Sequence, residues 1–377
     1  MVLALLGLAT AQPSTRVDQR RAAAFAASKC CATPQQQRLL DSIYRHAAVQ
    51  QRASVLADLD ANAPSHEAGN GSPNGRHKPF YPERDDVNDR GPAVRQRMRA
   101  YDQYALPLAR RAAEQALEQA DIQPDRIRQL VTVTCTGFVS PGMDVQLIDA
   151  LMLSPGVGRT TIGFMGCHGA INGLRVAQAL AESQPGAAVL LCAVELCSLH
   201  FQYGWDAQRT VANALFADGA AAVVGIAQDN RRADAPRPWR VAATGSCLLP
   251  NSRDAMTWTI GDHGFEMTLS PDVPRLIQSH LKTWLTGWLA ERALTIGDIG
   301  SWAVHPGGPR VLDAVEDALG LDDQALAESR NVLGQCGNMS SPTVLFIADR
   351  LQRHNAPRPC VMLAFGPGLV AEAALLI

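Results

Sequence analysis

The chain has 377 residues, of which 47% are hydrophobic and 19% are charged, and its formal net charge is −2. This is an ordinary globular composition, and the length suits two or three domains or one large duplicated unit. A charge balance so close to neutral gives no overall indication of binding to nucleic acid or to an anionic membrane surface.

The first ten residues, Met1 to Thr10, form an apolar run with two possible interpretations. A secretory signal peptide has such a core, but no basic residues precede this one and Gln12-Pro13-Ser14 follows it. We therefore predict a buried first strand. No apolar run approaches the ~20 residues that a membrane-spanning helix needs, so no membrane span is expected.

Three segments of different composition follow, up to residue 120. Residues 18–56 are predicted to be mostly helical. Residues 57–95 are rich in proline and glycine with mixed charge, which predicts a long surface loop or insertion. A helix is expected from Arg95 to Ala120, because Asp121-Ile-Gln-Pro124 then ends the helical pattern.

Short apolar strands then alternate with helices, which predicts an α/β fold. A polar stretch at 228–239 predicts a boundary between two halves, each with a strand that leads into a glycine-rich turn, and this suggests an internal duplication. The predicted strands are Leu130–Cys135, Ala187–Val194, Gly219–Ile226, Val241–Cys247, Gly300–Val304, Cys360–Phe365 and Val370–Leu376.

The cysteines give no pattern for metal binding or for disulfides. Only two of them are adjacent in the sequence, and no two are separated by two residues. We therefore expect neither a zinc site nor a disulfide framework, and a reducing, cytoplasmic environment fits best. The 9 cysteines are at positions 30, 31, 135, 167, 192, 197, 247, 336 and 360.

One cysteine, Cys167, lies where a β-branched apolar run ends and a helical pattern of Ile171, Leu174 and later residues begins. The free N–H groups and the dipole at a helix N-terminus favour a thiolate, so Cys167 is a candidate nucleophile. The alternative is a buried structural cysteine.

Two further segments carry residues that suit the same chemistry. His305 ends a predicted strand and is followed by Pro-Gly-Gly-Pro309, and Asn338 lies in a glycine-rich turn before a helix. An imidazolium lowers the pKa of a thiol, and His and Asn together donate hydrogen bonds to a developing oxyanion. Taken alone, each of these residues is more typical of a structural role.

These segments resemble type III polyketide synthases, the chalcone and stilbene synthase family of the thiolase superfamily, from about residue 2 to the end. The resemblance implies a duplicated, layered αβαβα thiolase-like fold, with the nucleophile in the half 1–228 and the histidine and asparagine in the half 229–377. The motifs that carry it are Gly166-Cys167, Leu215-Phe-Ala-Asp-Gly-Ala-Ala221, His305-Pro-Gly-Gly-Pro309, Gly337-Asn-Met-Ser-Ser341 and Phe365-Gly-Pro-Gly368.

The resemblance also implies the roles of individual residues. Cys167 would carry the starter and the growing chain, and His305 and Asn338 would hold the thioester carbonyl of malonyl-CoA during decarboxylation. Phe216 would separate the acyl pocket from the CoA tunnel. The partners would be malonyl-CoA, an acyl-CoA starter and a second copy of the chain in a homodimer, with no cofactor.

Other positions fall where family members line the cavity. Trp258 stands where chalcone synthases have a glycine, and Cys197 and His200 replace threonines, so a chalcone-type product is not expected. The Gly366 and Gly368 pair resembles the loop of the cyclisation pocket. The complete set is Thr136, Cys197, His200, Trp258, Met267, Ser340, Gly366 and Gly368.

The basic cluster that binds CoA in plant members is reduced in this sequence. Arg52 is the one basic residue of the matching stretch, Val49-Gln-Gln-Arg-Ala53, and Arg310 follows the histidine turn. We expect these two side chains to be the candidates for contact with the CoA phosphates.

Three alternatives remain open from the sequence. A β-ketoacyl-carrier-protein synthase of the initiating type has the same three catalytic residues, but the Gly337–Ser341 turn and Phe216 fit the polyketide branch better. A papain-like cysteine protease has the order Cys, His, Asn but a different signature around its cysteine. A non-catalytic CoA-binding scaffold is disfavoured because Cys167, His305, Asn338 and Phe216 are all present.

Overall fold

The computed structural model describes residues 1–56, 79–228 and 238–377. Part of the predicted loop at 57–95 and most of the predicted boundary at 228–239 lie outside the described residues. Where the loop is described, residues 79–93 form neither helix nor strand.

Nine strands form one large mixed sheet, in the order β11-β12-β13-β8-β1-β7-β6-β4-β5. The parallel pairs are β4 with β5 and with β6, and β11 with β12, while the other neighbours are antiparallel. The strands are β1 (Val2–Ala11), β4 (Ile127–Thr134), β5 (Gly158–Gly163), β6 (Ala188–Leu196), β7 (Asp218–Gln228), β8 (Arg240–Leu248), β11 (Ser301–Val304), β12 (Cys360–Gly366) and β13 (Val370–Leu376).

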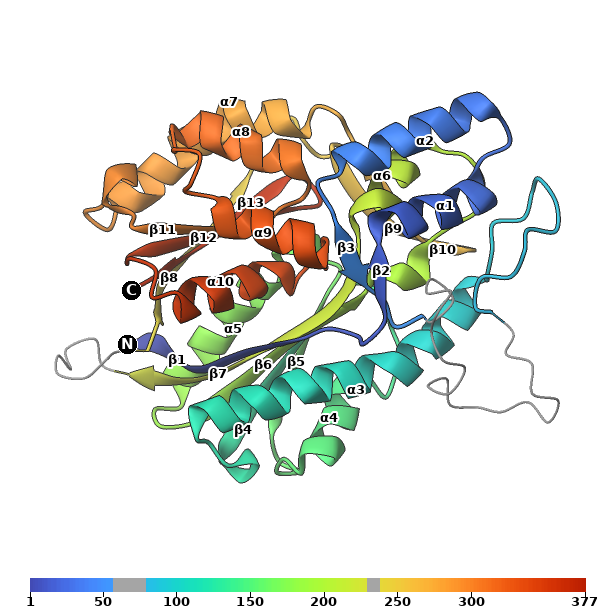
Figure 1. Cartoon of the computed structure of the whole chain (residues 1–377). Helices are drawn as coiled ribbons and strands as arrows, with labels where there is room; N and C mark the ends of the chain where they lie inside the picture. The colour runs from blue at the N-terminus through green and yellow to red at the C-terminus, as the bar shows by residue number, and fades with distance from the viewer. Residues whose placement is uncertain (57–78, 229–237) are drawn as a thin grey trace.

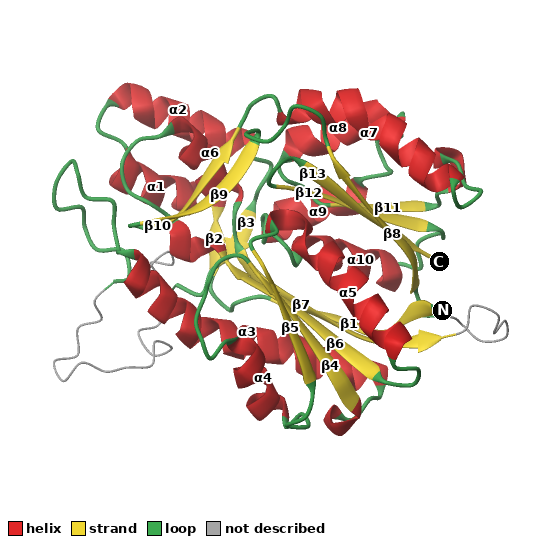
Figure 2. Cartoon of the chain, turned by 180° about the vertical axis from the view of Figure 1, so that it is seen from behind, coloured by secondary structure: helices red, strands yellow, loops and turns green. Residues whose placement is uncertain are grey.

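Helices cover both faces of the strands. Across the molecule, five layers follow one another: helices, strands, helices, strands and helices (Figures 1 and 2). Two helices, α3 (Val94–Ala120) and α4 (Met143–Leu151), cover the strands of the first half on one side. The central layer contains α5 (Gly169–Ser183), α9 (Ala327–Cys336) and α10 (Thr343–Arg353), between the two sets of strands. The outer layer on the other side is formed by α7 (Val273–Ala290) and α8 (Pro309–Leu319).

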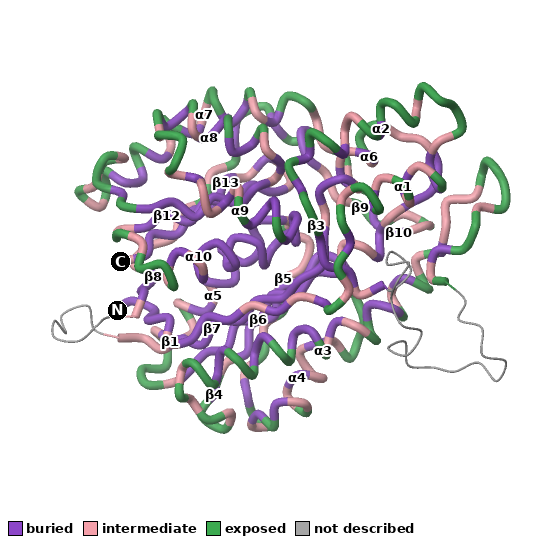
Figure 3. Tube along the Cα trace, in the orientation of Figure 1, coloured by how far each residue is buried: buried purple, intermediate pink, exposed green. Residues whose placement is uncertain are grey.

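A strand that is covered on both faces has a continuous apolar sequence rather than an alternation of apolar and polar residues. Every residue of β6 is buried, and the burial follows the layers through the molecule (Figure 3). Glu195 is the one charged residue in that strand. A buried carboxyl group in such a place needs hydrogen-bond donors around it.

A smaller unit packs on one end of the layers (Figure 1). Its helices are α1 (Gln19–Cys30), α2 (Pro34–His46) and α6 (Ala207–Leu215), which share a separate apolar core. Two short ribbons lie beside it, β2 (Arg16–Asp18) with β3 (Gln51–Ala53), and β9 (Met256–Gly261) with β10 (Gly264–Leu269).

The sequence predicted the main elements well. The run at the N-terminus is a buried strand, β1, and the long helix begins at Val94 and ends at Ala120. The β9–β10 hairpin was not predicted. No helix in the described ranges is long and apolar enough to cross a membrane.

Candidate active site

Cys167 lies in a short 3₁₀ turn, Gly166–His168, between β5 and the first residue of α5. Gly166 has a φ of +67°, a left-handed conformation that favours glycine, and a Cβ there would collide with Pro367. The backbone N–H of Gly166 donates to the sulfur of Cys135 over 3.1 Å. The turn therefore holds the Cys167 side chain at a fixed place, where it is 5% exposed.

Asn338 follows Gly337, whose φ of +72° ends α9. Its backbone pairs with the segment after α6, since Asn338 N donates to Leu215 O (2.9 Å) and Ala217 N donates to Asn338 O (2.8 Å). The side-chain oxygen Oδ1 accepts from Ser340 N at 2.8 Å. This bond orients the amide, and its buried nitrogen Nδ2 has no hydrogen-bond partner.

His305 is the first residue after β11, where its N–H donates to Leu363 O of the neighbouring strand over 2.8 Å. The glycine turn that follows packs on Leu215, the residue that also binds the Asn338 backbone. The imidazole is 1% exposed, and neither ring nitrogen has a hydrogen-bond partner.

Buried polar atoms without partners are rare in folded proteins, and each one requires an explanation. Here two of the side chains concerned, His305 and Asn338, are those expected to bind a substrate oxygen. The side chains of Asn338 and Ser340 also lie beside the sulfur of Cys167 and favour its thiolate. An oxyanion that enters the site would satisfy these donors.

The pKa of Cys167 is not lowered by its place at the helix N-terminus, contrary to the expectation. Burial raises the pKa of this thiol to about 12, and the nearby Glu195 carboxylate adds to the effect. Burial likewise lowers the pKa of His305 to about 3, with a further contribution from a charge on His168. Either charge alone is therefore costly in this site.

His168, next to the nucleophile, is held by a buried polar chain. Its Nδ1 lies 2.7 Å from Oδ1 of Asn172, and Asn172 Nδ2 donates to Glu372 Oε1 over 3.0 Å. Glu372 is 3% exposed and also accepts from Ser246 (2.8 Å) and Arg175. Because a carboxylate can only accept, the orientation of the Asn172 amide is fixed, and Nδ1 of His168 is the protonated nitrogen of the neutral ring.

A narrow cavity opens beside Cys167. Its volume is about 60 Å³. Eight of the predicted site residues line it: Cys167, Phe216, Thr136, Cys197, His200, Trp258, Met267 and Ser340.

One wall of the cavity consists of three rings. His200 stacks on Phe265 with centroids 4.2 Å apart, and Trp258 meets both rings edge-on. His200 Nδ1 accepts from Phe265 N (3.0 Å), and its Nε2 donates to Thr136 O (2.7 Å). Trp258 Nε1 donates to Cys135 O over 2.8 Å. Burial lowers the pKa of His200 to about 3, so this ring is a neutral, fixed part of the wall.

Glu195 lies under the cavity with both carboxylate oxygens bonded. Its Oε2 accepts from Cys135 N (2.8 Å) and from the Thr136 hydroxyl (2.7 Å), and its Oε1 accepts from the Ser341 hydroxyl (2.6 Å). Burial raises the pKa of Glu195 to about 7, although these hydrogen bonds oppose the shift.

Gly366 at the end of β12 and Gly368 in the turn that follows lie in different surroundings. Gly366 packs on the His168 ring, and Pro367 reaches the cavity wall. Gly368, with φ +98°, lies outside this cavity and borders a second hollow on the surface of the other half.

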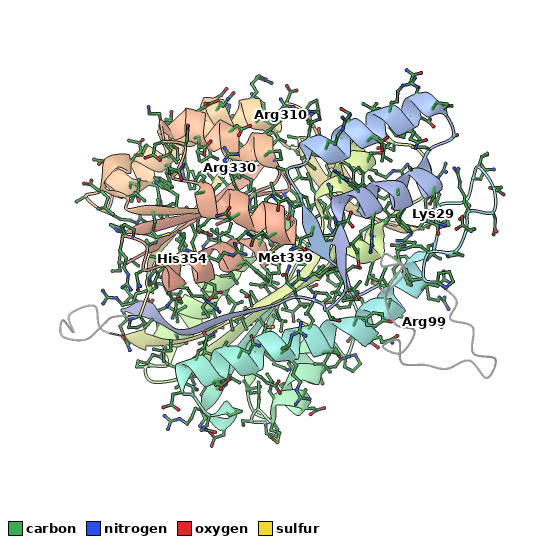
Figure 4. The ribbon with its side chains drawn as sticks, in the orientation of Figure 1. Lys29, Arg99, Arg310, Arg330, Met339 and His354 are labelled. Atoms are coloured by element: carbon green, nitrogen blue, oxygen red, sulfur yellow. The ribbon has the colours of Figure 1, made fainter. Side chains whose placement is uncertain are left out.

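The structure places one of the two predicted CoA-binding arginines inside the protein and the other on its surface. Arg52 is 5% exposed and donates to the carbonyl oxygens of Asn213 (2.7 Å), Ala214 (2.6 Å) and Phe216 (2.8 Å). Its guanidinium anchors the end of α6, so the prediction that Arg52 meets CoA phosphates is wrong. Arg310 is exposed at the start of α8 and lies on the outer edge of the molecule, whereas Met339, next to Asn338, lies near the centre (Figure 4).

Comparison with known proteins gives two matches to one family. The profile for "Chalcone and stilbene synthases, N-terminal domain" matches residues 81–229, and the profile for the C-terminal domain matches residues 240–377. The chain belongs to the chalcone and stilbene synthase family. Within it, the chain is a type III polyketide synthase, in agreement with the motifs around Cys167, His305 and Asn338.

Curated members of the chalcone and stilbene synthase family make different products from similar chains. The α-pyrone synthesis polyketide synthase-like Pks18 of Mycobacterium tuberculosis is 31% identical over 99% of this chain and 91% of its own. The 1,3,6,8-tetrahydroxynaphthalene synthase of Streptomyces peucetius is 38% identical over 72% of each chain. The 3,5-dihydroxyphenylacetyl-CoA synthase of Amycolatopsis orientalis is 33% identical over 73% of this chain and 75% of its own.

A solved member of the family confirms the thiolase-like fold. The crystal structure of PKS-I from the brown alga Ectocarpus siliculosus superimposes with a TM-score of 0.91 at 31% identity, and covers 100% of this chain and 98% of its own.

Several residues of this chalcone and stilbene synthase family site were not predicted from the sequence. Arg209, Ala212 and Asn213 line the cavity together with Phe216, and so do Gln202 and Phe265. Arg209, Ala212 and Asn213 share one face of α6, but the sequence does not show that this face meets a cavity.

Proposed function

We propose that this protein condenses malonyl-CoA repeatedly onto an acyl-CoA starter carried by Cys167, and then closes the chain to a resorcinol-, phloroglucinol- or pyrone-type ring. The observation that carries the proposal is the pair of buried side chains with nitrogen atoms that lack hydrogen-bond partners, Asn338 and His305, each of which has an N–H to donate, from Asn338 Nδ2 or from the neutral imidazole. Membership of the type III polyketide synthases supports it.

In the loading step, His305 accepts the proton of Cys167 while the sulfur attacks the starter thioester. The C–S bond to CoA breaks, and the leaving CoA thiolate takes the proton from His305. Because the proton stays between the two partners, the buried site never holds an isolated charge.

In the extension step, the bond from the malonyl α-carbon to the carboxylate breaks and CO₂ leaves. The electron pair moves to the thioester oxygen, where Asn338 and His305 donate hydrogen bonds to the enolate. The enolate carbon then attacks the acyl group on Cys167 and displaces the thiolate. The apolar side chain of Phe216 lies beside this position in the cavity wall, where it disfavours a charged carboxylate over neutral CO₂.

The active unit is proposed to be a homodimer without a bound cofactor, in the cytoplasm. One edge of the large sheet is formed by β5, and exposed apolar side chains surround it. The ring of Phe138 packs against that of Phe164 beside this strand at a tilted angle, with centroids 4.9 Å apart. An exposed strand edge with an apolar surround suits pairing with a second copy. The exposed side chains are Phe138, Val139, Met152 and Met165.

The experiment is incubation of the purified protein with malonyl-CoA and a panel of acetyl-, fatty acyl- and aromatic acyl-CoA starters, followed by mass spectrometry of products and intact protein. We expect an acyl adduct on Cys167 and cyclic polyketides from one starter class. Asn338→Ala should still load the starter but lose about 10²–10³ in extension rate, since it removes one oxyanion donor. Asn331→Ala, an exposed change on α9, is the control. A Cys167 adduct that is extended only from a malonyl-carrier protein would favour the β-ketoacyl synthase alternative.

A further inference from the structure

A positively charged side chain faces the cavity from α6. Arg209, Ala212 and Asn213 line the cavity, so one face of this helix forms part of its wall, next to Phe216 at the helix C-cap. Arg209 is the one arginine or lysine among the described residues that line it. The remaining wall is largely apolar, with Met256, Trp258, Phe265 and Met267. A charge in such surroundings interacts more strongly with an opposite charge than it would in water.

The guanidinium of Arg209 is only partly satisfied by the protein. One nitrogen, Nη1, donates to Gln202 Oε1 over 3.0 Å. The Nε atom is buried without a hydrogen-bond partner. The carboxylate of Asp206 lies 3.9 Å from Nε, but its Oδ1 accepts from the backbone N–H of Arg209 at the start of α6. Asp206 thus balances part of the charge and leaves the donor unused.

Gln202 adds a second unused donor to the same wall. It lines the cavity and is 3% exposed. Because its oxygen accepts from Arg209, the amide orientation is fixed, and its nitrogen Nε2 is buried without a partner. Two neighbouring donors, one of them on a cation, are thus buried and unsatisfied beside a cavity. That arrangement suits an anionic oxygen group, which accepts two hydrogen bonds at once.

We propose that Arg209 and Gln202 form a subsite for an anionic oxygen group, a carboxylate or a phosphate, on the part of the acyl-CoA substrate that lies far from Cys167. The inference rests on the proposed function, and it defines the substrate class of the same site.

The position of the subsite excludes one source of the anion. Arg209 lies near the start of α6 and Phe216 caps its other end, so their backbones are about 10 Å apart at the rise of an α-helix. The carboxylate that malonyl-CoA loses is only two bonds from its thioester carbonyl, so it must lie near Asn338 and Phe216. The anion at Arg209 therefore belongs either to the far end of the starter acyl group or to the phosphates of CoA.

The test compares four substrates that load Cys167. Hexanoyl-CoA and adipoyl-CoA have the same chain length, but adipoyl-CoA ends in a carboxylate, and the two pantetheine thioesters of the same acids lack the nucleotide phosphates. The rate of acylation of Cys167 is measured by intact-protein mass spectrometry for the wild type, Arg209→Gln and Gln202→Leu. Arg38→Gln, an exposed change on α2, is the matched control.

If the anion is a starter carboxylate, Arg209→Gln slows adipoyl transfer about tenfold from both CoA and pantetheine and leaves hexanoyl transfer unchanged. If the anion is a phosphate, Arg209→Gln slows both CoA thioesters by a similar factor and leaves both pantetheine thioesters unchanged. Gln202→Leu should give the same pattern with a smaller factor, and Arg209→Lys should restore part of the rate.

Equal effects on all four substrates would mean that Arg209 only supports the wall, and unchanged rates would mean that it binds nothing; either result overturns the proposal. Loading does not require extension, so the two proposals fail separately. Selective loading without polyketide formation would refute the proposed function alone. Polyketide formation with no dependence on Arg209 would refute the subsite alone.

Discussion

The backbone of Gly366 is packed against the imidazole ring of His168, the residue next to the nucleophile. A Cβ on residue 366 would lie 2.7 Å from Nε2 of His168 and 2.8 Å from the carbonyl oxygen of Met165. Neither neighbour moves easily, because Met165 contributes backbone and His168 is held by Asn172 over 2.7 Å. The loop of Gly366 and the turn of Cys167 are therefore fixed against each other.

Gly366→Ala should displace the turn that carries Cys167. We expect it to lose most of the polyketide-forming activity and about 1–3 kcal/mol of unfolding free energy, the usual cost of overpacking. The measurements are product formation and urea unfolding. Gly287→Ala on α7 is the control, since a Cβ there meets nothing within 4 Å, and it should be neutral or stabilising. Wild-type activity in Gly366→Ala would show that the contact has no role in the site.

The reactivity of Cys167 should depend on His305. Burial raises the pKa of the thiol and lowers the pKa of the imidazole, so each charge needs the other. We expect wild-type Cys167 to react with iodoacetamide below pH ~8, and His305→Gln to move the alkylation midpoint upward by at least ~2 pH units. The midpoint is read by mass spectrometry of the Cys167 peptide. Equal midpoints in the two proteins would exclude proton transfer to His305.

Local sequence identified the residues whose roles depend on their neighbours in the chain. Cys167, His305 and Asn338 each stand beside a glycine-rich turn, and these turns match the observed φ values at Gly166 and Gly337. The alternation of strands and helices predicted the α/β class, and the layered thiolase-like arrangement was implied by the family resemblance. The positions of these residues were thus predictable, while their protonation was not.

The surroundings of Arg52 and Arg209 could not be predicted from the sequence. Arg52 was expected at the surface, but it lies inside, where the free carbonyl groups at the end of α6 accept from it. Arg209 was not predicted, since the helix pattern does not show which face of α6 meets a cavity. Both outcomes depend on tertiary packing. The raised pKa of Cys167 has the same origin, because burial outweighs the effect of the helix N-terminus.

Glu195 should make the protein less stable as the pH rises. Burial raises its pKa from 4.5 to about 7, so the folded state holds a proton that the unfolded state releases. The stabilisation is complete below pH ~4.5 and is lost as the pH rises through about 7, and it amounts to about 3 kcal/mol. Asp218, with its pKa raised to about 6, acts in the same direction. Glu195→Gln should therefore show a smaller decrease in unfolding free energy between pH 5 and 8 than the wild type does. Identical pH dependence by urea unfolding would contradict a buried, protonated Glu195.

Trp258 should limit the length of the starter. Its indole forms one wall of the cavity with His200 and Phe265, and the cavity volume is only about 60 Å³. Trp258→Ala should enlarge this space and shift starter use toward longer fatty acyl-CoAs, with at least a ~10-fold gain relative to the shortest starter that the wild type accepts. The ratio is measured by competition between two starters in one mixture. Trp284→Ala, a change on α7 in the outer layer, removes an indole away from the cavity and should leave the ratio unchanged. If the two variants give the same ratio, the ring wall does not select the starter.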